Sequence, residues 1–503
     1  MTIDVDPDRA GEAMNPYWRV CVGGGRVAEA LRADFQKHLE MVQKDFPFQY
    51  LRMHGLFHED MMVYREENGE PVVNWQYVDL VYDHWLSIGI RPFVELGFMP
   101  YDLASGDDTV FWWRGNITPP KDGARWEWLV GQFADHVIAR YGHEEVRRWY
   151  FEVWNEPNLT YFWKNGDFEA YMELYERAAR ALKRVDPQLR VGGPASAGFG
   201  DRPGTPPWGR EFLDACAQRH LPLDFFSTHP YPTLHPVDID GQGYMVWDGR
   251  DRLLVDAQGC ANLLQASAYP HIERHYTEWS SSPSPRDPVH DTAFLTSFLV
   301  ENNLRARGLM DSLSFWVVSD IFEESRQGDT PFHGGFGLVN IQGLKKPSYH
   351  GYWFLSRLGE EWIEGGDSFV VSRRRDGTMA VLLWNYCHYR EDANDSRLMA
   401  GAKAREIYDL FALEPAKETT VRVKTASTVR VQTTRFDRDH GSVYDAWVAM
   451  GAPSHILPAD REALRRQAEL SVTVQRIPAP GGRAEWTVPL EPFGVTLLEI
   501  RRE

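Results

Sequence analysis

The chain has 503 residues, of which 43% are hydrophobic, and its formal net charge at pH 7 is -18. Such an acidic protein gains neither counterion release on nucleic acid nor attraction to an anionic membrane, so both partners are excluded and a neutral small ligand is expected. The length exceeds what one hydrophobic core usually covers, which predicts a large domain with at least one further domain.

The cysteines and the N-terminal segment bear on the cellular compartment. Cys21, Cys216, Cys260 and Cys387 lie far apart without CxxC spacing, which predicts buried thiols rather than a zinc site or a disulfide framework. The first residues show no basic start followed by an apolar stretch, and the sequence has no apolar run of about 18 residues. We therefore expect a cytoplasmic protein without a membrane span.

Short apolar segments alternate with longer helical patterns from residue 18 to about residue 320, which is typical of repeated βα units around a parallel sheet. In 126–141, for example, Trp126, Phe133 and Val137 share one helical stripe. Eight such units predict a (β/α)8 TIM barrel over residues 14–345. The expected strands are WRVCVG at 18, FQYLRMHG at 48, RPFVELG at 91, RWYFEVWNEPN at 148, RVGGPA at 190, DFFSTHPYP at 224, RHYTEWS at 274 and SLSFWVVSD at 312.

After residue 345 the pattern changes to short alternating runs, which predict a C-terminal antiparallel β-sandwich over residues 346–503. The runs are SFVVSRR, MAVLLWNY, TVRVKTAS, TVRVQTTRF and GVTLLEIRR. A helical stretch near 441–468 interrupts them, and residues 1–13 are candidates for an additional strand of this domain.

In such barrels the chemistry is located where strands end and βα loops begin. Glu156 and Glu278 close the fourth and seventh expected strands and so face one another across the barrel mouth, which is the arrangement of a glycosidase. Aromatic neighbours such as Trp154 and Trp163 would raise the pKa of Glu156 toward that of a general acid. The other residues that close strands are Arg52, His54, Asn155, His229, Tyr231, Trp316, Glu323 and Glu324.

The strand-end motifs RMHGLF, FEVWNEPN, STHPYP, HYTEWS and FWVVSDIFEE occur in this order. With them the chain resembles glycoside hydrolase family 39, the β-xylosidase group of clan A, over nearly its whole length. The resemblance implies a retaining mechanism with Glu156 as acid/base and Glu278 as nucleophile, and places Arg52 and Tyr231 beside Glu278. The predicted sandwich matches the accessory domain of that family.

The chemistry of retention assigns the same roles. One carboxylate must attack the anomeric carbon, while a protonated acid assists the leaving oxygen and later deprotonates water. Glu156 fits the cycling role, and Glu278 must stay ionised beside cationic or hydrogen-bonding partners. Asn155 is expected to hold the sugar 2-hydroxyl, a contact that tightens in the transition state.

The remaining strand-end residues have less specific patterns. His54 and His229 are expected to contact the ligand, structural hydrogen bonding being the alternative. Trp316 is expected to form a stacking floor. At least one of Glu323 and Glu324 is expected to bind sugar hydroxyls. The loop 106–122 carries aromatic residues that either wall a pocket or pack the loop onto the barrel: Phe111, Trp112 and Trp113.

Other classes of function have weaker support. VGGGRVAEA after the first strand resembles a phosphate-binding loop, but the GxGxxG spacing is absent and no acidic residue closes the second strand. HIERH at 271–275 lacks the HExxH order, so neither a metal nor another cofactor is expected. A non-catalytic sugar-binding protein is opposed by the presence of both carboxylates.

The substrate class is predicted from the charge of the strand ends. An α-L-iduronidase must hold a substrate carboxylate, yet Arg52 is the one basic residue besides histidine among those strand ends. We therefore predict an exo-acting β-xylosidase that releases xylose from short oligosaccharides, with α-L-arabinosidase or α-L-iduronidase activity as alternatives. The loop 106–122 and the FWVVSDIFEE segment are expected to close the pocket, and the oligomeric state stays open.

Overall fold

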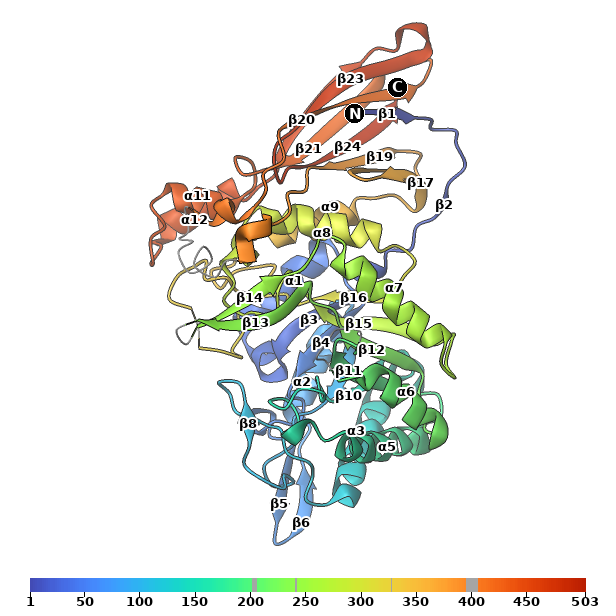
Figure 1. The fold of residues 1–503 in the computed structure, drawn as a ribbon, viewed down its shortest axis with the longest axis vertical. Coiled ribbons are helices and arrows are strands. Elements are labelled where there is room, and N and C mark those ends of the chain that lie inside the picture. The colour runs from blue at the N-terminus through green and yellow to red at the C-terminus, as the bar shows by residue number, and fades with distance from the viewer. Residues whose placement is uncertain (201–205, 240–241, 327, 395–405) are drawn as a thin grey trace.

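The computed structural model describes residues 1–200, 206–239, 242–326, 328–394 and 406–503. Within these residues eight parallel strands close into a barrel in chain order, which confirms the predicted TIM barrel, and a β-sandwich lies above it in Figure 1. The barrel strands are β3 (Cys21–Arg26), β4 (Tyr50–His54), β7 (Arg91–Leu96), β10 (Tyr150–Val153), β11 (Arg190–Ala197), β12 (Phe225–His229), β15 (Glu273–Trp279) and β16 (Ser312–Phe315).

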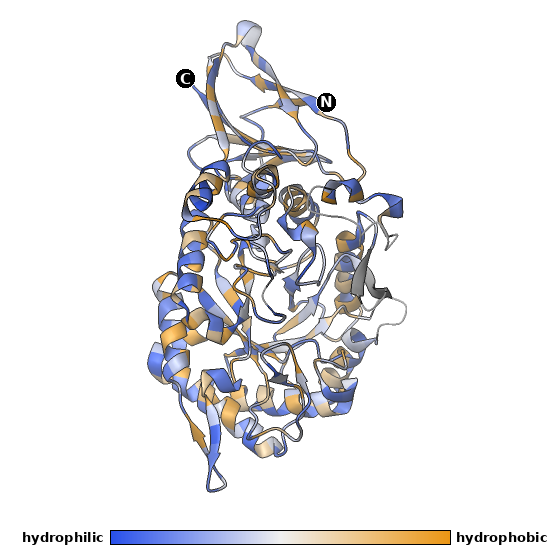
Figure 2. Ribbon diagram, turned by 90° about the vertical axis from the view of Figure 1, so that its left-hand side faces the viewer, coloured by the Kyte–Doolittle hydropathy of each residue, from blue (hydrophilic) through white to orange (hydrophobic). Residues whose placement is uncertain are grey.

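A helix follows each barrel strand. In α3 the Asp122 side chain accepts the Ala124 and Arg125 N–H groups at the N-terminus, and Trp126, Phe133 and Val137 are buried as the stripe predicts. Figure 2 shows hydrophobic and hydrophilic residues alternating around these outer helices. The helices are α1 (Ala33–Asp45), α2 (Gln76–Ser87), α3 (Gly123–Tyr141), α5 (Phe168–Val185), α6 (Trp208–Gln218), α7 (Arg252–Gln265), α8 (Phe294–Arg305) and α9 (Pro347–Ser356).

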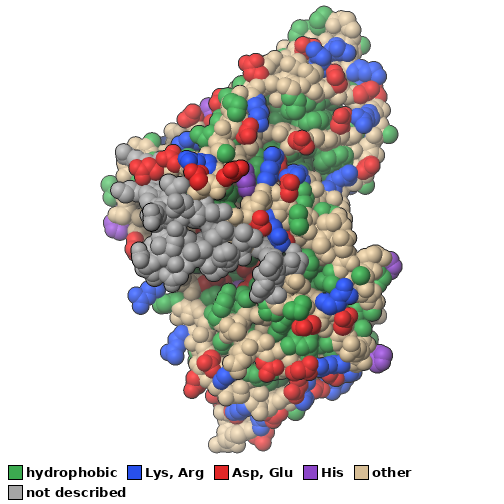
Figure 3. Space-filling view, viewed as in Figure 1, with side chains coloured by type: hydrophobic (Ala, Val, Ile, Leu, Met, Phe, Trp, Pro, Cys, Tyr) green, Lys and Arg blue, Asp and Glu red, His purple; other side chains and the backbone are tan. Residues whose placement is uncertain are grey.

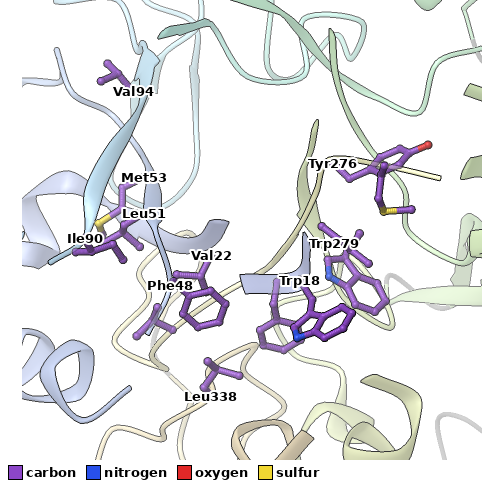
Figure 4. Close-up of a cluster of buried hydrophobic side chains, with 14 of the residues drawn as sticks. Trp18, Val22, Phe48, Leu51, Met53, Ile90, Val94, Tyr276, Trp279 and Leu338 are labelled. Carbon is purple, nitrogen blue, oxygen red and sulfur yellow. The ribbon is translucent and has the colours of Figure 1, made fainter. Parts of the chain in front are cut away.

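Strand side chains alternate between two cores. Those that point outward, such as Val22, Leu51 and Val94, join the large buried cluster of Figure 4, which also contains Trp18 and Trp279. Those that point inward at the base of the barrel form a buried, mostly aromatic layer. Its members are Cys21, Tyr50, Phe93, Tyr150 and Phe225.

The sandwich consists of a seven-stranded and a three-stranded sheet among the described residues. The N-terminal segment takes part in both, because β1 (Thr2–Val5) pairs in parallel with β20 and β2 (Glu12–Ala13) pairs with β17. Ile3 and Val5 are buried between the sheets. The remaining strands are β17 (Glu361–Gly366), β18 (Phe369–Arg373), β19 (Met379–Trp384), β20 (Lys417–Lys424), β21 (Val429–Phe436), β22 (Ser471–Ile477), β23 (Arg483–Leu490) and β24 (Val495–Arg502).

The helix α9 belongs by its packing to the barrel. Tyr349 and Tyr352 contact the Phe46 ring, at 4.6 and 6.2 Å between centroids, and Tyr352 also contacts Phe315 of β16. In place of the domain boundary predicted at residue 345, we propose one after Ser356, because α9 completes the eighth βα unit. The helices α11 (Val443–Ala449) and α12 (Pro458–Gln467) lie within the stretch expected to be helical.

Three hairpins extend from the barrel loops: β5 (Tyr64–Glu67) with β6 (Glu70–Val73), β8 (Thr109–Val110) with β9 (Gly115–Asn116), and β13 (Thr233–Ile239) with β14 (Gln242–Trp247). All four cysteines are buried free thiols, as predicted. In the described parts of the chain, no helix combines the length and the hydropathy that crossing a bilayer requires. On the face shown in Figure 3, basic side chains are interspersed with acidic ones.

Candidate active site

A charged layer lies above the aromatic floor of the barrel. Because side chains alternate along a strand, Arg52 points inward two residues after Tyr50, Glu95 two after Phe93, and Glu152 two after Tyr150. The strand register places Glu95 directly beside Glu152. All three side chains are fully buried. The two candidate catalytic carboxyl groups, Glu156 and Glu278, lie beside this layer.

Glu156 follows β10 in a turn of unusual backbone conformation. Its φ angle is 44° and that of Trp154 is 74°, a region that side-chain-bearing residues seldom adopt and that is common at functional sites. The Glu156 N–H donates to the Ala195 carbonyl at 2.9 Å. The Asn158 side chain exchanges two hydrogen bonds with the Ala197 backbone. The neighbouring strand β11 therefore fixes the turn.

The surroundings of Glu156 favour its protonated form. Glu156 is 7% exposed, and burial raises its pKa to about 7, although the charges of Arg52 and His54 oppose the shift. Trp154 and Trp163 are fully buried, and their expected contribution to this pKa stays a prediction. A carboxyl with this pKa can donate a proton and later accept one near neutral pH.

Glu278 at the end of β15 has partners that favour the ionised form. Tyr231 donates its hydroxyl to Oε1 at 2.7 Å, and the Arg52 Nη1 lies 3.4 Å from Oε2. Burial raises the pKa of Glu278 to about 6, an effect to which the Glu156 charge adds and which Arg52 opposes. Arg52 and Tyr231 thus contact the carboxylate beside which they were expected.

Arg52 joins the charged layer to Glu278 and Asn155. Its Nε donates to Glu152 at 2.5 Å, its Nη2 lies 2.9 Å from Glu95, and the same Nη2 donates to the Asn155 Oδ1 at 2.9 Å. A guanidinium is suited to several simultaneous carboxylate contacts, since its five donors form a rigid planar fork. The Asn155 amide is thereby held in one orientation.

His54 bridges two carboxylates. Its Nδ1 lies 2.6 Å from Glu95 and its Nε2 lies 3.3 Å from Glu324. Burial opposes the charged imidazolium, but these two carboxylates outweigh it and raise the pKa of His54 to about 10. His54 is therefore a cation at neutral pH, and it holds Glu324 at the barrel mouth.

Glu323 and Glu324 have different neighbours although they are adjacent in sequence. The Glu323 carboxylate pairs with Arg26 and, at 3.1 Å, with Arg32, and its backbone N–H donates to the buried Glu29 at 2.9 Å. Glu324 instead contacts His54 inside the site. Of the two candidates for sugar binding, Glu324 is the one that the fold brings to the other site residues.

His229 contacts the acid/base candidate directly. Its Nδ1 lies 2.8 Å from the Glu156 Oε1, and its Nε2 lies 3.1 Å from the Thr277 hydroxyl. Burial lowers the pKa of His229 to about 4, so the ring is neutral at pH 7. The two histidines of the strand ends thus differ in charge.

Trp316 lies below His54, with 4.7 Å between the ring centroids, and is 1% exposed. The glycine-rich segment after the first strand makes room for it, because a Cβ on Gly23 would come within 2.2 Å of the Trp316 ring. Those glycines therefore serve close packing. In the loop 106–122, Trp113 is buried and Phe111 stacks on His54, so these two pack the loop, whereas Trp112 is 56% exposed.

A metal ion is the alternative occupant of this centre. Glu156, His229 and Glu278 each offer one ligand atom within 4.8 Å of the others. Tyr231 already donates to one Glu278 oxygen, however, and the positive charge of Arg52 lies beside the other. We interpret the cluster as a catalytic pair.

Glu95, Glu152 and Thr277 belong to the site, although they lie inside strands and the strand-end rule does not point to them. Thr277 donates its hydroxyl to the Glu152 Oε1 at 2.8 Å. A signal was present in the segments RPFVEL and YFEV, because an isolated charge inside a short apolar strand is seldom buried without a partner. The partner, Arg52, stands in another strand and is not identifiable from local pattern.

The family model described as "Glycosyl hydrolases family 39" matches residues 1–483. A β-xylosidase of Geobacillus stearothermophilus is 37% identical over 510 residues, which covers 99% of this chain and 95% of that protein. The solved structure of the GH39 enzyme from Xanthomonas axonopodis pv. citri matches with a TM-score of 0.90 at 32% identity, covering 100% of this chain and 97% of that chain. A monomeric β-xylosidase from Caulobacter crescentus CB15 matches with a TM-score of 0.89 at 32% identity, covering 100% and 99%.

The match extends over barrel and sandwich alike, and the motifs that carry the resemblance in the sequence are the ones whose side chains meet at the barrel mouth. The predicted family is therefore confirmed: the chain belongs to glycosyl hydrolase family 39.

Proposed function

We propose that this protein is an exo-acting β-xylosidase that cleaves short xylo-oligosaccharides with retention of configuration. The observation that carries the proposal is the catalytic pair. One oxygen of Glu156 and one of Glu278 lie within 4.8 Å of each other. Retaining glycosidases hold their carboxyl groups about 5 to 5.5 Å apart, whereas inverting enzymes need about 6.5 Å or more to admit water. The pair supports direct attack by a carboxylate.

The mechanism follows from the different partners of the two groups. Glu278, as a carboxylate, attacks the anomeric carbon, and the bond to the leaving oxygen breaks while Glu156 gives that oxygen its proton. The covalent xylosyl-enzyme is then hydrolysed when Glu156, now a carboxylate, takes a proton from water. The water oxygen attacks the same carbon, and Glu278 leaves as a carboxylate.

The contacts around the pair suit a neutral sugar. Because Arg52 engages the Asn155 Oδ1, the amide presents its NH2 group as a donor, and we assign it to the 2-hydroxyl. Glu324, held by His54, is assigned to hydroxyls at the blind end of the pocket, above the Trp316 floor. An iduronide carboxylate would need a free cation, but Arg52 and His54 are both engaged by the enzyme's own carboxylates.

The proposal of exo action rests on how enclosed the pair is. Glu156 and Glu278 are 7% and 8% exposed, which supports a narrow pocket for one terminal sugar rather than an open cleft along a polymer. Trp112 and Tyr161, 56% and 57% exposed, stand at the rim, where we place the leaving part of the oligosaccharide. Short soluble substrates and four reduced thiols suit the cytoplasm, which is the compartment we propose.

The experiment is a hydrolysis panel of nitrophenyl β-xyloside, β-glucoside, α-L-arabinoside and α-L-iduronide, with NMR of the first product. The proposal predicts that the β-xyloside has the highest kcat/KM and that β-xylose forms before mutarotation. A second assay analyses the products of xylohexaose hydrolysis at early times, and we expect free xylose among them. Preference for the iduronide would refute the proposed substrate. First-formed α-xylose would refute retention of configuration, and internal cleavage to xylotriose without free xylose would refute exo action.

A further inference from the structure

A chain of four buried side chains runs from the acid/base residue to the charged layer. Glu156 Oε1 is 2.8 Å from His229 Nδ1, His229 Nε2 is 3.1 Å from Thr277 Oγ1, and Thr277 Oγ1 is 2.8 Å from Glu152 Oε1. The other Glu152 oxygen accepts from Arg52 at 2.5 Å. The proposed function uses Glu156 and leaves the rest of this chain unexplained.

The hydrogen bonds among these four side chains determine which atom carries each proton. The carboxylate of Glu152 is paired with Arg52 and can only accept, so the single Thr277 proton is donated to it. Toward His229 the Thr277 oxygen must then accept, so the proton of the neutral imidazole is on Nε2. The Nδ1 atom is left as an acceptor, and the hydrogen bond to Glu156 exists only when Glu156 supplies the proton.

We propose that Thr277 and Glu152 are positioning residues that fix His229 as its Nε2–H tautomer and thereby hold Glu156 in the protonated form that the acid step requires. The inference rests on the proposed function, because it concerns the acid of that reaction. The raised pKa of Glu156 and the lowered pKa of His229 have the directions that this arrangement demands. The proton positions follow from the hydrogen bonds and do not depend on these two pKa values.

Other charges also face Glu156 and His229 and have to stay unchanged in a test. They come from six of the eight barrel strands or from the loops that follow them. These groups are Arg52 and His54 of β4, Glu95 of β7, Tyr161 after β10, Tyr231 after β12, Glu278 of β15 and Glu324 after β16. Thr277 carries no charge, so substituting it leaves this field in place.

The tautomer acts on both half-reactions. In the first, the Glu156 proton goes to the leaving oxygen as its bond to the anomeric carbon breaks. The resulting Glu156 carboxylate faces the lone pair of His229 Nδ1, which destabilises its negative charge. Glu156 is therefore a stronger base toward water in the second half-reaction. An Nδ1–H tautomer would do the opposite, since it would donate to the carboxylate and stabilise it.

The variant Thr277→Val removes the acceptor for Nε2–H while keeping the side-chain shape. His229 then gains by moving its proton to Nδ1 and donating to Glu156. We expect the alkaline limb of kcat/KM for xylobiose to move down by about one pH unit, about a tenfold loss on that side. A dinitrophenyl xyloside, which needs no acid, should keep its alkaline activity. Thr277→Ser should restore the limb.

The matched control is Thr228→Val. Thr228 is a buried threonine of the neighbouring strand whose hydroxyl donates to the Ser196 carbonyl at 2.9 Å. The hydroxyl is also 3.4 Å from the Ser196 hydroxyl, so Thr228→Val loses two buried hydrogen bonds without altering the hydrogen bonds that lead to Glu156. The alkaline limb of Thr228→Val should therefore coincide with that of the unmodified enzyme. An equal shift in Thr228→Val and Thr277→Val would mean a general effect of a damaged barrel and would overturn the proposal.

The tautomer itself is observable without substrate. The chain has 17 histidines, and comparison with a His229→Gln variant assigns the His229 ring signals in a 1H–15N spectrum. Neutral His229 with the proton on Nε2 supports the proposal, and an Nδ1–H tautomer or an imidazolium at pH 7 overturns it, even if Thr277→Val does not fold. If the enzyme hydrolysed no xyloside, the proposed function would fail, while this spectrum would still decide the tautomer.

Discussion

The two proposed catalytic carboxyl groups, Glu156 and Glu278, have different neighbours in the barrel mouth. Tyr231 and Arg52 both contact Glu278, whereas Glu156 contacts the neutral His229. Donors beside a carboxylate stabilise its charge, and an acceptor beside a carboxyl stabilises its proton. These surroundings therefore suit the same residue type to two different tasks within one site.

The pH dependence of kcat/KM should be bell-shaped, with its maximum between about pH 6 and 7. Attack needs ionised Glu278, whose pKa is raised to about 6, so activity rises as pH increases through that value. Leaving-group assistance needs protonated Glu156, whose pKa is raised to about 7, so activity falls above it. Rates on xylobiose from about pH 4 to 9 check this, and a plateau on the alkaline side would contradict it.

At the scale of single residues, the sequence predicted which side chains lie at the barrel mouth better than it predicted their contacts. Strand-end position was sufficient to place Arg52, Tyr231 and both proposed catalytic carboxylates at the barrel mouth. It could not separate Glu323 from Glu324, because the difference depends on Arg26 and Arg32, which stand far away in the sequence. Partners that are joined by tertiary folding leave no local pattern.

At the scale of elements, the loop after β16 carries a natural matched pair. Glu324→Ala should lower kcat/KM for nitrophenyl β-xyloside by about 100-fold or more, since a contact remote from the cleaved bond also orients the sugar. Glu323→Ala removes a carboxylate of equal charge that is paired with Arg26 and Arg32. It should leave kcat/KM within about twofold, because the Glu323 carboxylate contacts these two arginines rather than the residues around Glu156 and Glu278. Equal losses in the two variants would contradict the assignment.

The hairpin β8–β9 presents Trp112 beside a surface pocket of about 420 Å³. The backbone N–H of Trp112 donates to the backbone carbonyl of Glu324 at 2.8 Å, which connects this hairpin to the loop after β16. Trp112→Ala should raise KM for xylotriose several-fold, because a sugar face loses its stacking partner. KM for nitrophenyl β-xyloside is the internal control. An equal increase in KM for both substrates would mean that Trp112 contacts the sugar in the pocket rather than at its rim.

The strands differ in how well local pattern predicts them. All eight barrel strands were expected, because buried parallel strands are continuous apolar runs. In the sandwich, β17, β22 and β23 were not expected. The strand β22 has exposed residues on both faces, including Val472 and Val474, so it lacks the alternation that indicates a half-buried strand. Its place is determined by pairing with β21.

For the whole molecule, a buried contact joins the sandwich to the barrel. Trp384 of β19 donates its indole N–H at 2.5 Å to Glu301 of α8, a carboxylate that also pairs with Arg250 and Arg305. Glu301 is fully buried. The sandwich therefore supplies a hydrogen-bond donor to a buried carboxylate of the barrel.

Trp384→Phe should destabilise the protein by about 1 to 3 kcal/mol, since it leaves a buried carboxylate oxygen without its donor. The midpoint of denaturant unfolding measures this effect, and kcat should be unchanged. Trp486→Phe is the control, because the Trp486 indole nitrogen has no hydrogen-bond partner among the described residues. If both variants lowered the midpoint equally, the contact with Glu301 would not be what joins the domains.

The central claim is that Glu278 forms a covalent bond with the sugar, and a mechanism-based label tests it most directly. A 2-deoxy-2-fluoro β-xyloside with a dinitrophenyl leaving group should form a xylosyl-enzyme that hydrolyses slowly, because fluorine destabilises the oxocarbenium-like transition state. Peptide mass spectrometry should then find one fluoroxylosyl group on Glu278. An enzyme that turns over natural substrate but carries no label, or carries it on Glu156, would contradict the account.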